Sequence, residues 1–163
     1  MKKSQNMHKV IFFLYLLIVV RLIIFKYPIE VLRQIAASWE KNVILEGLDT
    51  ANFTLFKTIR MYIDYAYKLN SFENLAGNIV VFIPFGFLLP SVLVWGRNFF
   101  VMLLNAFIFV LGIEVFQLFS AFGAFDVDDI LLNCLGAALG YFLFMIWESI
   151  GKEKKDGSIF KKG

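Results

Sequence analysis

Acidic and amide side chains inside long apolar runs are the residues of this sequence that could do chemistry. Glu114 lies within the apolar run 99–122, and Gln117 follows three positions later on the same face of a helix. An ionised side chain at the centre of a membrane helix costs about 2.5 to 3.5 kcal/mol on insertion scales. Asn105 falls on the opposite face. The pair at 114 and 117 therefore predicts either a functional site or polar contacts with neighbouring helices.

A second polar stripe begins in the loop 123–129 and continues into the last apolar run. Asp128 points away from this stripe, and we expect it to cap a helix or to lie at the positive end of the helix dipole, a role that is also open to Asp126. The two glycines of the stripe are four residues apart, which favours close packing on another helix. At 100° per residue the stripe consists of Asp126, Asp129, Asn133, Gly136 and Gly140.

A third polar group stands near the start of the apolar run 75–95. Asn78 lies there, with Asn74 four residues earlier on the same helix face. Pro84, further along the run, cannot donate a hydrogen bond to the carbonyl of Val80, so we expect a bend and a new partner for the exposed carbonyl. Interhelical hydrogen bonding is a sufficient role for Asn74.

Three kinds of role are open to these polar groups. Carboxylates could attract the amines of an amphiphile while amides orient it, or Glu114, Asp126 and Asp129 could hold a divalent cation such as Mg²⁺ or exchange protons. The groups could also only join helices in a structural subunit. We expect the candidate site residues to converge in one pocket: Asn78, Glu114, Gln117, Asp126, Asp129 and Asn133.

Other chemistry is excluded by composition. The chain has one cysteine, Cys134, and one histidine, His8, so an internal disulfide, a zinc cage of such ligands and a Ser/His/Asp triad have no residues to form them. No phosphate-binding loop or hydrolase signature accompanies the carboxylates. These exclusions make an enzyme the less favoured interpretation, although it stays open.

The elements that must position these residues are membrane helices. Of 163 residues 60% are hydrophobic and 18% charged, and the mean hydropathy is +0.72, which is well beyond the apolar share of a soluble domain. The sequence predicts an all-α integral membrane four-helix bundle, with spans at 10–25, 75–95, 99–122 and 130–147 in a domain of residues 1–150. We expect a basic tail, 151–163, without regular structure.

Charge gives the expected orientation. The net charge of +3 comes from basic residues that flank the spans, a distribution typical of cytoplasmic membrane flanks and not of a nucleic-acid partner. Arg21 replaces the small residues of a signal-peptide cleavage site, which favours an uncleaved anchor in the cell membrane. The flanks place both termini in the cytoplasm and comprise Lys2, Lys3, Lys9, Arg97, Lys152, Lys154, Lys155, Lys161 and Lys162.

The connection 26–74, expected outside the cell, carries two further patterns. Apolar residues recur at helical spacing after Pro28, which predicts an amphipathic helix along the membrane interface. A mixed segment, 53–69, predicts a shorter interfacial helix. The apolar positions of the first helix are Ile29, Leu32, Ile35, Ala36, Trp39 and Val43, and those of the second include Phe56, Ile59, Ile63 and Tyr67.

Three blocks in this order resemble the VanZ-like family of small membrane proteins. They are Asn-Ile-Val-Val-Phe-Ile-Pro-Phe-Gly-Phe-Leu-Leu-Pro over 78–90, Glu114-x-x-Gln117, and Asp126-x-x-Asp129-x-x-x-Asn133-x-x-Gly136-x-x-x-Gly140. The resemblance extends over about 52–141 and includes the segment 52–59. It departs from the family at Gly123, where an Arg is usual, and at Leu55, where a Pro is usual.

The resemblance implies an envelope protein associated with tolerance of the lipoglycopeptide teicoplanin, by a route that does not rebuild the peptidoglycan terminus. Three functions follow as alternatives. The first is binding of an amphiphile, either a lipid-linked wall precursor or the antibiotic, in an outer-leaflet pocket. The second is an enzyme acting on a lipid head group with a carboxylate-held cation, and the third is a structural subunit of a membrane assembly.

Overall fold

Four long helices form a bundle, and three short helices cover one end of it. The computed structural model describes residues 2–23, 28–37, 43–65, 71–120 and 122–159, and the part it describes is all-α without a strand. The long helices are α1 (Lys2–Ile23), α5 (Ser71–Val92), α6 (Phe99–Ser120) and α7 (Val127–Ile159). The short ones are α2 (Ile29–Ala37), α3 (Val43–Thr50) and α4 (Lys57–Asp64), and a 3₁₀ turn, η1 (Val94–Arg97), joins α5 to α6.

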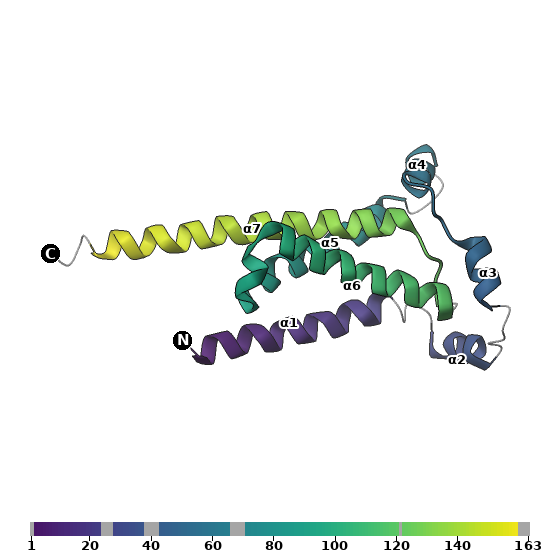
Figure 1. Ribbon diagram of the computed structural model, residues 1–163, viewed down its shortest axis with the longest axis horizontal. Coiled ribbons are helices and arrows are strands. Elements are labelled where there is room, and N and C mark those ends of the chain that lie inside the picture. Colours follow the sequence, from purple (N-terminus) through teal and green to yellow (C-terminus); the bar gives the residue numbers. More distant parts are fainter. Residues whose placement is uncertain (1, 24–27, 38–42, 66–70, 121, 160–163) are drawn as a thin grey trace.

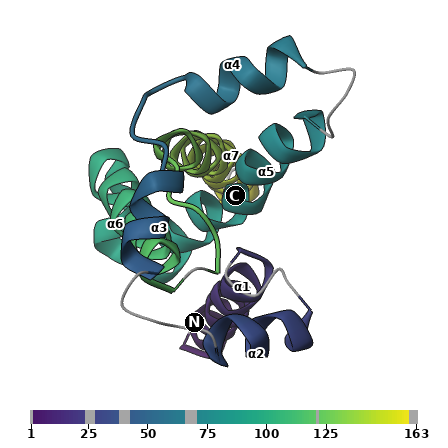
Figure 2. The ribbon, with the colours of Figure 1, turned by 90° about the vertical axis from the view of Figure 1, so that its right-hand side faces the viewer.

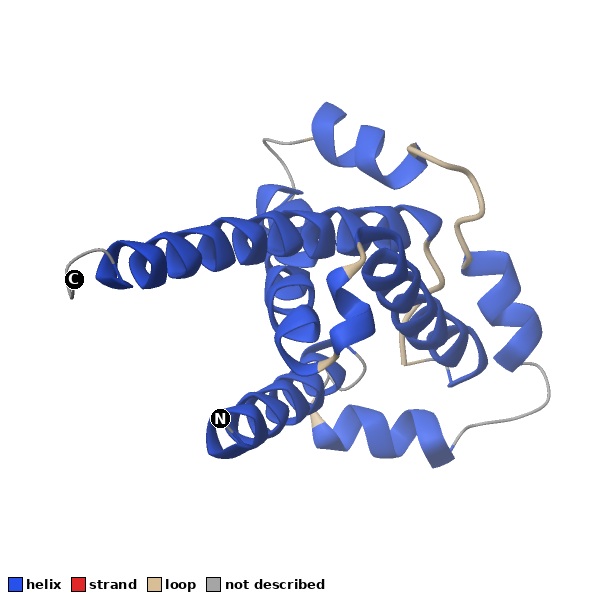
Figure 3. Ribbon diagram, turned by 60° about the vertical axis from the view of Figure 1, so that its left-hand side comes forward, coloured by secondary structure: helices blue, strands red, loops and turns tan. Residues whose placement is uncertain are grey.

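Both chain termini lie toward the same end of the bundle, opposite α2, α3 and α4 (Figure 1). We call these the termini end and the connector end. Viewed onto the connector end, the three short helices are spread around the ends of the long ones (Figure 2). Every described element is a helix or a loop (Figure 3). The even number of long helices brings the two termini to one side, as the sequence predicts.

Each long helix contains a segment long and apolar enough to cross a membrane. These segments are Asn6–Ile23, Glu73–Val92, Phe99–Ser120 and Val127–Gly151. The observed helix ends differ from the predicted spans, most clearly after the second span and around the fourth. The second span ends at Val92 because η1 follows it, and the fourth helix begins at Val127 and continues to Ile159, so the tail is helical well past 151. No proline interrupts the tail, and its lysines and glutamate are good helix formers.

The contact of α5 with α7 is backbone against backbone. A Cβ atom added to Gly136 would overlap the carbonyl oxygen of Ile79, and one added to Gly140 would overlap that of Ile83. Gly86, on α5, approaches the carbonyl of Ala137 in the same way. The glycine face predicted from sequence is therefore confirmed, and its partner is α5. Small residues allow this approach, which gains van der Waals contact that lipid does not provide.

Aromatic side chains join α1 and α6 to this pair. The rings of Phe12 and Phe85 are 5.7 Å apart, and those of Phe85 and Phe109 are also 5.7 Å apart. The Tyr15 hydroxyl donates to the carbonyl of Val81 at 2.9 Å. The sequence predicts that the carbonyl of Val80 needs a new partner, because Pro84 cannot donate to it. The Tyr15 hydroxyl bonds to the neighbouring carbonyl, that of Val81. The helix α5 continues through both Pro84 and Pro90.

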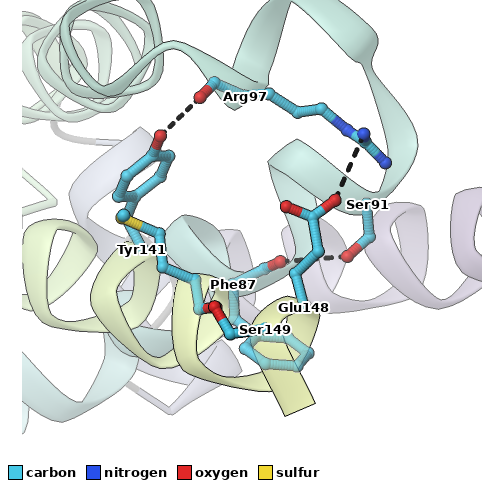
Figure 4. A network of polar contacts seen from close by, with 7 residues as sticks. Phe87, Ser91, Arg97, Tyr141, Glu148 and Ser149 are labelled. Carbon is cyan, nitrogen blue, oxygen red and sulfur yellow. Dashed lines mark hydrogen bonds and ion pairs between the residues drawn. The ribbon is translucent and has the colours of Figure 1, made fainter. Parts of the chain in front are cut away.

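Polar contacts at the termini end attach η1 to α7 (Figure 4). The Tyr141 hydroxyl donates to the carbonyl of Arg97, and Arg97 Nη1 lies 3.2 Å from Glu148 Oε1. Because Arg97 is 56% exposed, this ion pair contributes little to stability. The ring of Trp147 lies on Phe87 at 5.9 Å and is half exposed. Such partly exposed aromatics are typical of a membrane interface.

The connector end has more elements than the sequence predicts. The amphipathic helix after Pro28 ends at Ala37 with Leu32 buried, and Val43 begins a separate helix, α3. Trp39, Phe25 and Tyr67, which the predicted elements include, lie outside the described residues. In α3, Gly47 lies so close to the carbonyl of Leu118 that a Cβ would be 2.6 Å from the oxygen. The helix α3 therefore rests on α6.

The second interfacial helix is shorter than the predicted segment 53–69. It begins at Lys57, because the preceding residues form a turn in which the Thr54 amide donates to Asn52 Oδ1 at 3.0 Å. Phe56 has a φ of 64°, in the left-handed region that few non-glycine residues adopt. Its amide is held by a carboxylate from α7, as described below.

Candidate functional site

A polar cavity of about 340 Å³ lies at the connector end, bounded by α1, α4, α5, α6 and α7. Three of the six candidate residues line it: Asn78, Gln117 and Asp129. The other polar residues in its wall are Tyr62, Glu73 and Asn74, and the remaining wall is formed by Leu22, Ile23, Gly77, Val81 and Ala124. The cavity therefore combines carboxylates and amides with an apolar side.

Two hydrogen bonds order the amides of the wall. Asn78 Nδ2 on α5 donates to Asp129 Oδ1 on α7 at 2.5 Å. Gln117 Nε2 on α6 donates to the backbone carbonyl of Ile23 at 3.3 Å. That carbonyl belongs to the last turn of α1, where helical carbonyls have no partner within the helix. The two amides therefore tie four long helices together around the cavity.

Glu114 and Asp126 lie behind the cavity wall and hold the loop that enters α7. Glu114 is 1% exposed, and its Oε2 accepts a hydrogen bond from the Asp126 amide at 2.9 Å. Asp126 caps α7, because its Oδ1 accepts from the Asp128 amide at 2.8 Å. The same carboxylate accepts from Asn52 Nδ2 at 2.8 Å and from Thr58 Oγ1 at 2.5 Å. These contacts give both residues a structural role.

Asp128 caps a helix, but not its own. Its side chain is completely buried, and it accepts hydrogen bonds from the amides of Phe56 at 2.5 Å, Thr58 at 2.8 Å and Ile59 at 3.2 Å. The first amides of α4 are thus satisfied by α7. The sequence correctly predicts that Asp128 points away from the polar stripe, but spacing within one helix cannot show that the segment 54–59 lies on that side.

The last candidate, Asn133, is buried one turn further along α7 from Asp129. It is 2% exposed, and its Oδ1 has no hydrogen-bond partner among the described residues. A buried amide oxygen without a donor is costly, so such an atom calls for an unseen donor. Asn105, which the sequence analysis set apart, donates to the carbonyl of Val101 in its own helix at 2.7 Å.

Three further residues line the cavity that were not predicted as site residues. Tyr62 and Glu73 were not singled out, and Asn74 was expected to make a contact between helices, a prediction that its place in the wall does not contradict. Glu73 and Asn74 lie about one turn before Asn78, so their spacing was a usable signal. No sequence signal indicated Tyr62, because its position depends on how α4 folds back over α5.

The carboxylates affect the chemistry of Tyr62. Burial, together with the negative charges of Asp129 and Asp126, raises the pKa of the Tyr62 hydroxyl above its ordinary value of 10.0. The phenol is therefore neutral at physiological pH and acts as a hydroxyl that donates and accepts hydrogen bonds.

The carboxylates considered for a divalent cation do not come together as a ligand set. Within the described part of the chain, no group of three or more His, Cys, Asp or Glu side chains could hold a metal ion. Glu114 and Asp126 instead accept hydrogen bonds from backbone and side-chain donors.

Gly123→Ala is expected to displace Gln117 from the cavity wall. A Cβ atom at position 123 would lie 2.7 Å from both Cδ and Nε2 of Gln117. Because Gln117 is only 4% exposed and has little room to move, the cost should be about 1 kcal/mol. A lower melting temperature in detergent checks this. Gly112→Ala is the matched control, since a Cβ there would meet no atom within 4 Å apart from the adjoining residues and backbone of its own helix; equal melting temperatures would contradict the prediction.

Comparison with known proteins agrees with the resemblance carried by the three sequence blocks at 78–90, 114–117 and 126–140. A model of the VanZ/LLP1 family matches residues 12–148, which covers the cavity, all of α5 and α6, and the greater part of α1 and α7. The chain belongs to the VanZ/LLP1 family. Protein VanZ of Enterococcus faecium is 32% identical to it over 87 residues, which are 52% of this chain and 52% of that protein. The chain thus spans about half the length of this relative. No solved structure matches the chain.

The VanZ/LLP1 match and the four apolar helices together establish a multi-pass membrane protein. Large hydrophobic side chains on the outer faces of these helices are exposed, as a lipid bilayer environment requires. The family blocks at 78–90, 114–117 and 126–140 map onto α5, α6 and α7. In this VanZ/LLP1 chain they supply the cavity residues Asn78, Val81, Gln117 and Asp129 and the close contact of α5 with α7.

Proposed function

We propose that this VanZ/LLP1 protein contributes to tolerance of teicoplanin-type lipoglycopeptides by binding an amphiphile in the cavity at the connector end. One observation carries the proposal: the cavity joins a carboxylate and amide wall to an apolar wall within a membrane bundle. A ligand with a polar head and an apolar tail matches both walls. A lipid-linked wall precursor and the antibiotic itself are both of this kind.

The proposed orientation puts the cavity in the outer leaflet. The basic flanks Lys2, Lys3, Lys9 and Arg97 belong to the termini end, and an excess of such residues marks the cytoplasmic side of short flanks. The cavity is at the opposite end, between α1, α5 and α7. A ligand could then enter from the extracytoplasmic surface, where wall synthesis is completed and the antibiotic acts.

Asp129→Asn tests the binding role. The change removes the charge from the cavity but keeps an oxygen that can accept from Asn78 Nδ2, so folding should be preserved. We expect the variant to lose the tolerance that the unchanged protein confers on a susceptible host, measured as the minimal inhibitory concentration of teicoplanin. Expression and the melting temperature of the detergent-extracted protein should be nearly unchanged.

Glu148→Gln is the matched control, because it removes a carboxylate at the termini end, where its partner Arg97 is 56% exposed and the ion pair contributes little to stability. This variant should keep full tolerance. If Asp129→Asn lowers stability and tolerance together, the structural-subunit alternative is favoured. If it changes neither, the cavity has no part in tolerance and the proposal is wrong.

A further inference from the structure

A groove of about 490 Å³ lies between α6 and α7 on the outer surface of the bundle. Its wall consists of apolar side chains and one thiol, and it extends along α7 from Val127 to Cys134, a rise of about 10 Å. In a bilayer such a groove is filled by hydrocarbon, because an empty one would lose van der Waals contact on both walls. The exposed members of the wall on the two helices are Phe100, Leu104, Phe107 and Leu131.

The segment between α3 and α4 closes the connector end of this groove. Leu55 lines the groove from that segment, which crosses the connector end beside the start of α7 (Figure 2). The Asn52 amide donates to the carbonyl of Phe125 at 2.8 Å, and the Asn52 carbonyl accepts from the Val127 amide at 3.0 Å. Asp128 accepts from the first amides of α4, as described above. Hydrogen bonds therefore hold this end of the groove in place.

Two basic side chains follow Leu55. Lys57 comes two residues later, at most about 7 Å away along the chain, and Arg60 lies three residues further on the same face of α4. Both side chains are exposed. Neither forms an ion pair within the described part of the chain. An anionic group at the connector end of the groove would therefore meet two positive charges.

The acidic residues near these cations are engaged elsewhere or lie apart from them. The carboxylates of Asp126 and Asp128 accept hydrogen bonds from amide and hydroxyl donors of the neighbouring segment, and Asp128 is completely buried. Two exposed acids, Asp49 on α3 and Asp64 at the far end of α4, form no ion pair within the described residues. No described carboxylate neutralises either cation by direct contact, so both can bind an external anion.

Exposed apolar side chains surround the two cations. Phe53, Leu55 and Phe56 are 61%, 50% and 44% exposed. The ring of Phe53 packs on that of Phe125 at 5.1 Å. Apolar side chains beside basic ones are typical of surfaces that enter a membrane at the level of the head groups, where the apolar groups contact acyl chains and the cations contact phosphate.

We propose that the groove binds an anionic glycerophospholipid of the bilayer, with one acyl chain between α6 and α7 and the phosphate group held by Lys57 and Arg60. The acyl chain matches the apolar wall, and two cations at its end match a head group of net negative charge. A zwitterionic lipid offers the same chain and phosphate, but its ammonium group is repelled by the same cations. The groove shares no wall residue with the polar cavity, so this site is independent of the proposed function.

Native mass spectrometry tests the class of lipid. The purified full-length protein in a non-ionic detergent is titrated with phosphatidylglycerol or with phosphatidylcholine of identical acyl chains, and the fraction of protein that carries one lipid is measured. We expect phosphatidylglycerol to bind at least about fivefold more tightly. Glycerol 3-phosphate, which has the phosphate without a chain, should not bind measurably. Equal binding of the two lipids, or no binding of either, overturns the proposal.

Two substitutions locate the head group. Lys57→Gln and Arg60→Gln should each weaken phosphatidylglycerol binding about fivefold and leave phosphatidylcholine binding unchanged. Both positions are exposed, so folding should be preserved. Arg33→Gln is the matched control, because it removes an exposed arginine from α2, on the opposite side of the connector end from α4 (Figures 1 and 2). A preference for phosphatidylglycerol that survives in both Lys57→Gln and Arg60→Gln refutes the assignment.

A second pair of variants locates the acyl chain. Leu131→Trp fills the groove and should weaken the binding of both lipids, whereas Leu139→Trp lies outside the groove and should not. The two leucines lie on the same helix and are 39% and 42% exposed, so neither change should lower the melting temperature in detergent. Equal lipid binding by these variants contradicts the proposal. Tighter binding of undecaprenyl phosphate than of phosphatidylglycerol also overturns it, since the groove would then belong to an isoprenoid carrier.

Discussion

Gly136→Leu is expected to prevent α7 from packing on α5 and to leave little folded protein. The new side chain would overlap the carbonyl of Ile79, which belongs to a helix backbone and cannot rotate away. Extra atoms in a packed core typically cost about 1 to 3 kcal/mol, and we expect at least the upper value because a backbone must shift. That is a large fraction of the total stability of a typical protein, about 5 to 15 kcal/mol.

Gly112→Leu provides the control. It adds the same side chain to a glycine on α6, also within a long apolar helix, but the new Cβ meets no atom within 4 Å apart from the adjoining residues and backbone of α6 itself. We expect its effect to be within about 0.5 kcal/mol. Folded yield and melting temperature, measured by size-exclusion chromatography after heating in detergent, compare the two. Similar values for both variants would show that the α5–α7 contact is looser than described.

Asp128→Ala is expected to release α4 from the bundle. The completely buried carboxylate accepts from the amides of Phe56, Thr58 and Ile59, and its loss leaves these donors without an acceptor. Hydrogen bonds to a charged group contribute about 1.5 to 3 kcal/mol, so the start of α4 should lose at least this much local stability. Phe56, in its left-handed conformation, would no longer be held there.

Hydrogen exchange measures this release directly. In Asp128→Ala the amides of Phe56, Thr58 and Ile59 should exchange at least about tenfold faster, since 1.4 kcal/mol corresponds to a factor of ten. Amides in the middle of α7 should change much less. Asp64→Ala, at the exposed C-terminal end of the same helix, should leave these rates unaltered. Protection retained in Asp128→Ala would mean that other contacts hold α4. Because Tyr62 lies on this helix, release of α4 also opens the cavity.

Much of the architecture follows from local patterns. Each of the four long helices is recognisable because hydrocarbon excludes unsatisfied backbone groups, so only a long apolar helix can cross it. The close-packed face of Gly136 and Gly140 follows from their four-residue spacing. The pattern of the connection 26–74 is weaker. Its helix after Pro28 was predicted with the correct start, and Val43, which was assigned to the same helix, belongs to α3; residues 38–42 lie outside the described residues.

The division of the polar residues into two groups could not be predicted in the same way. Helical periodicity places Glu114 beside Gln117, and Asp126 beside Asp129, and these pairs do share a side of the bundle. Within each pair, however, one residue lines the cavity and the other holds a loop. The two residues of a pair differ in their depth along the helix and in their distance from the loop that enters α7. The angle of a residue around the helix axis specifies neither.

The sequence by itself determined that this chain lies in a membrane, which faces of its helices turn to one another, and that costly polar groups must meet inside it. Only the tertiary structure decided that Asp128 holds α4 and that Asp129 meets Asn78 and Tyr62 at a cavity. The physical reason is range. Burial and periodicity act along one helix, whereas these partners lie up to about seventy residues away in sequence and are chosen by the path of the connection.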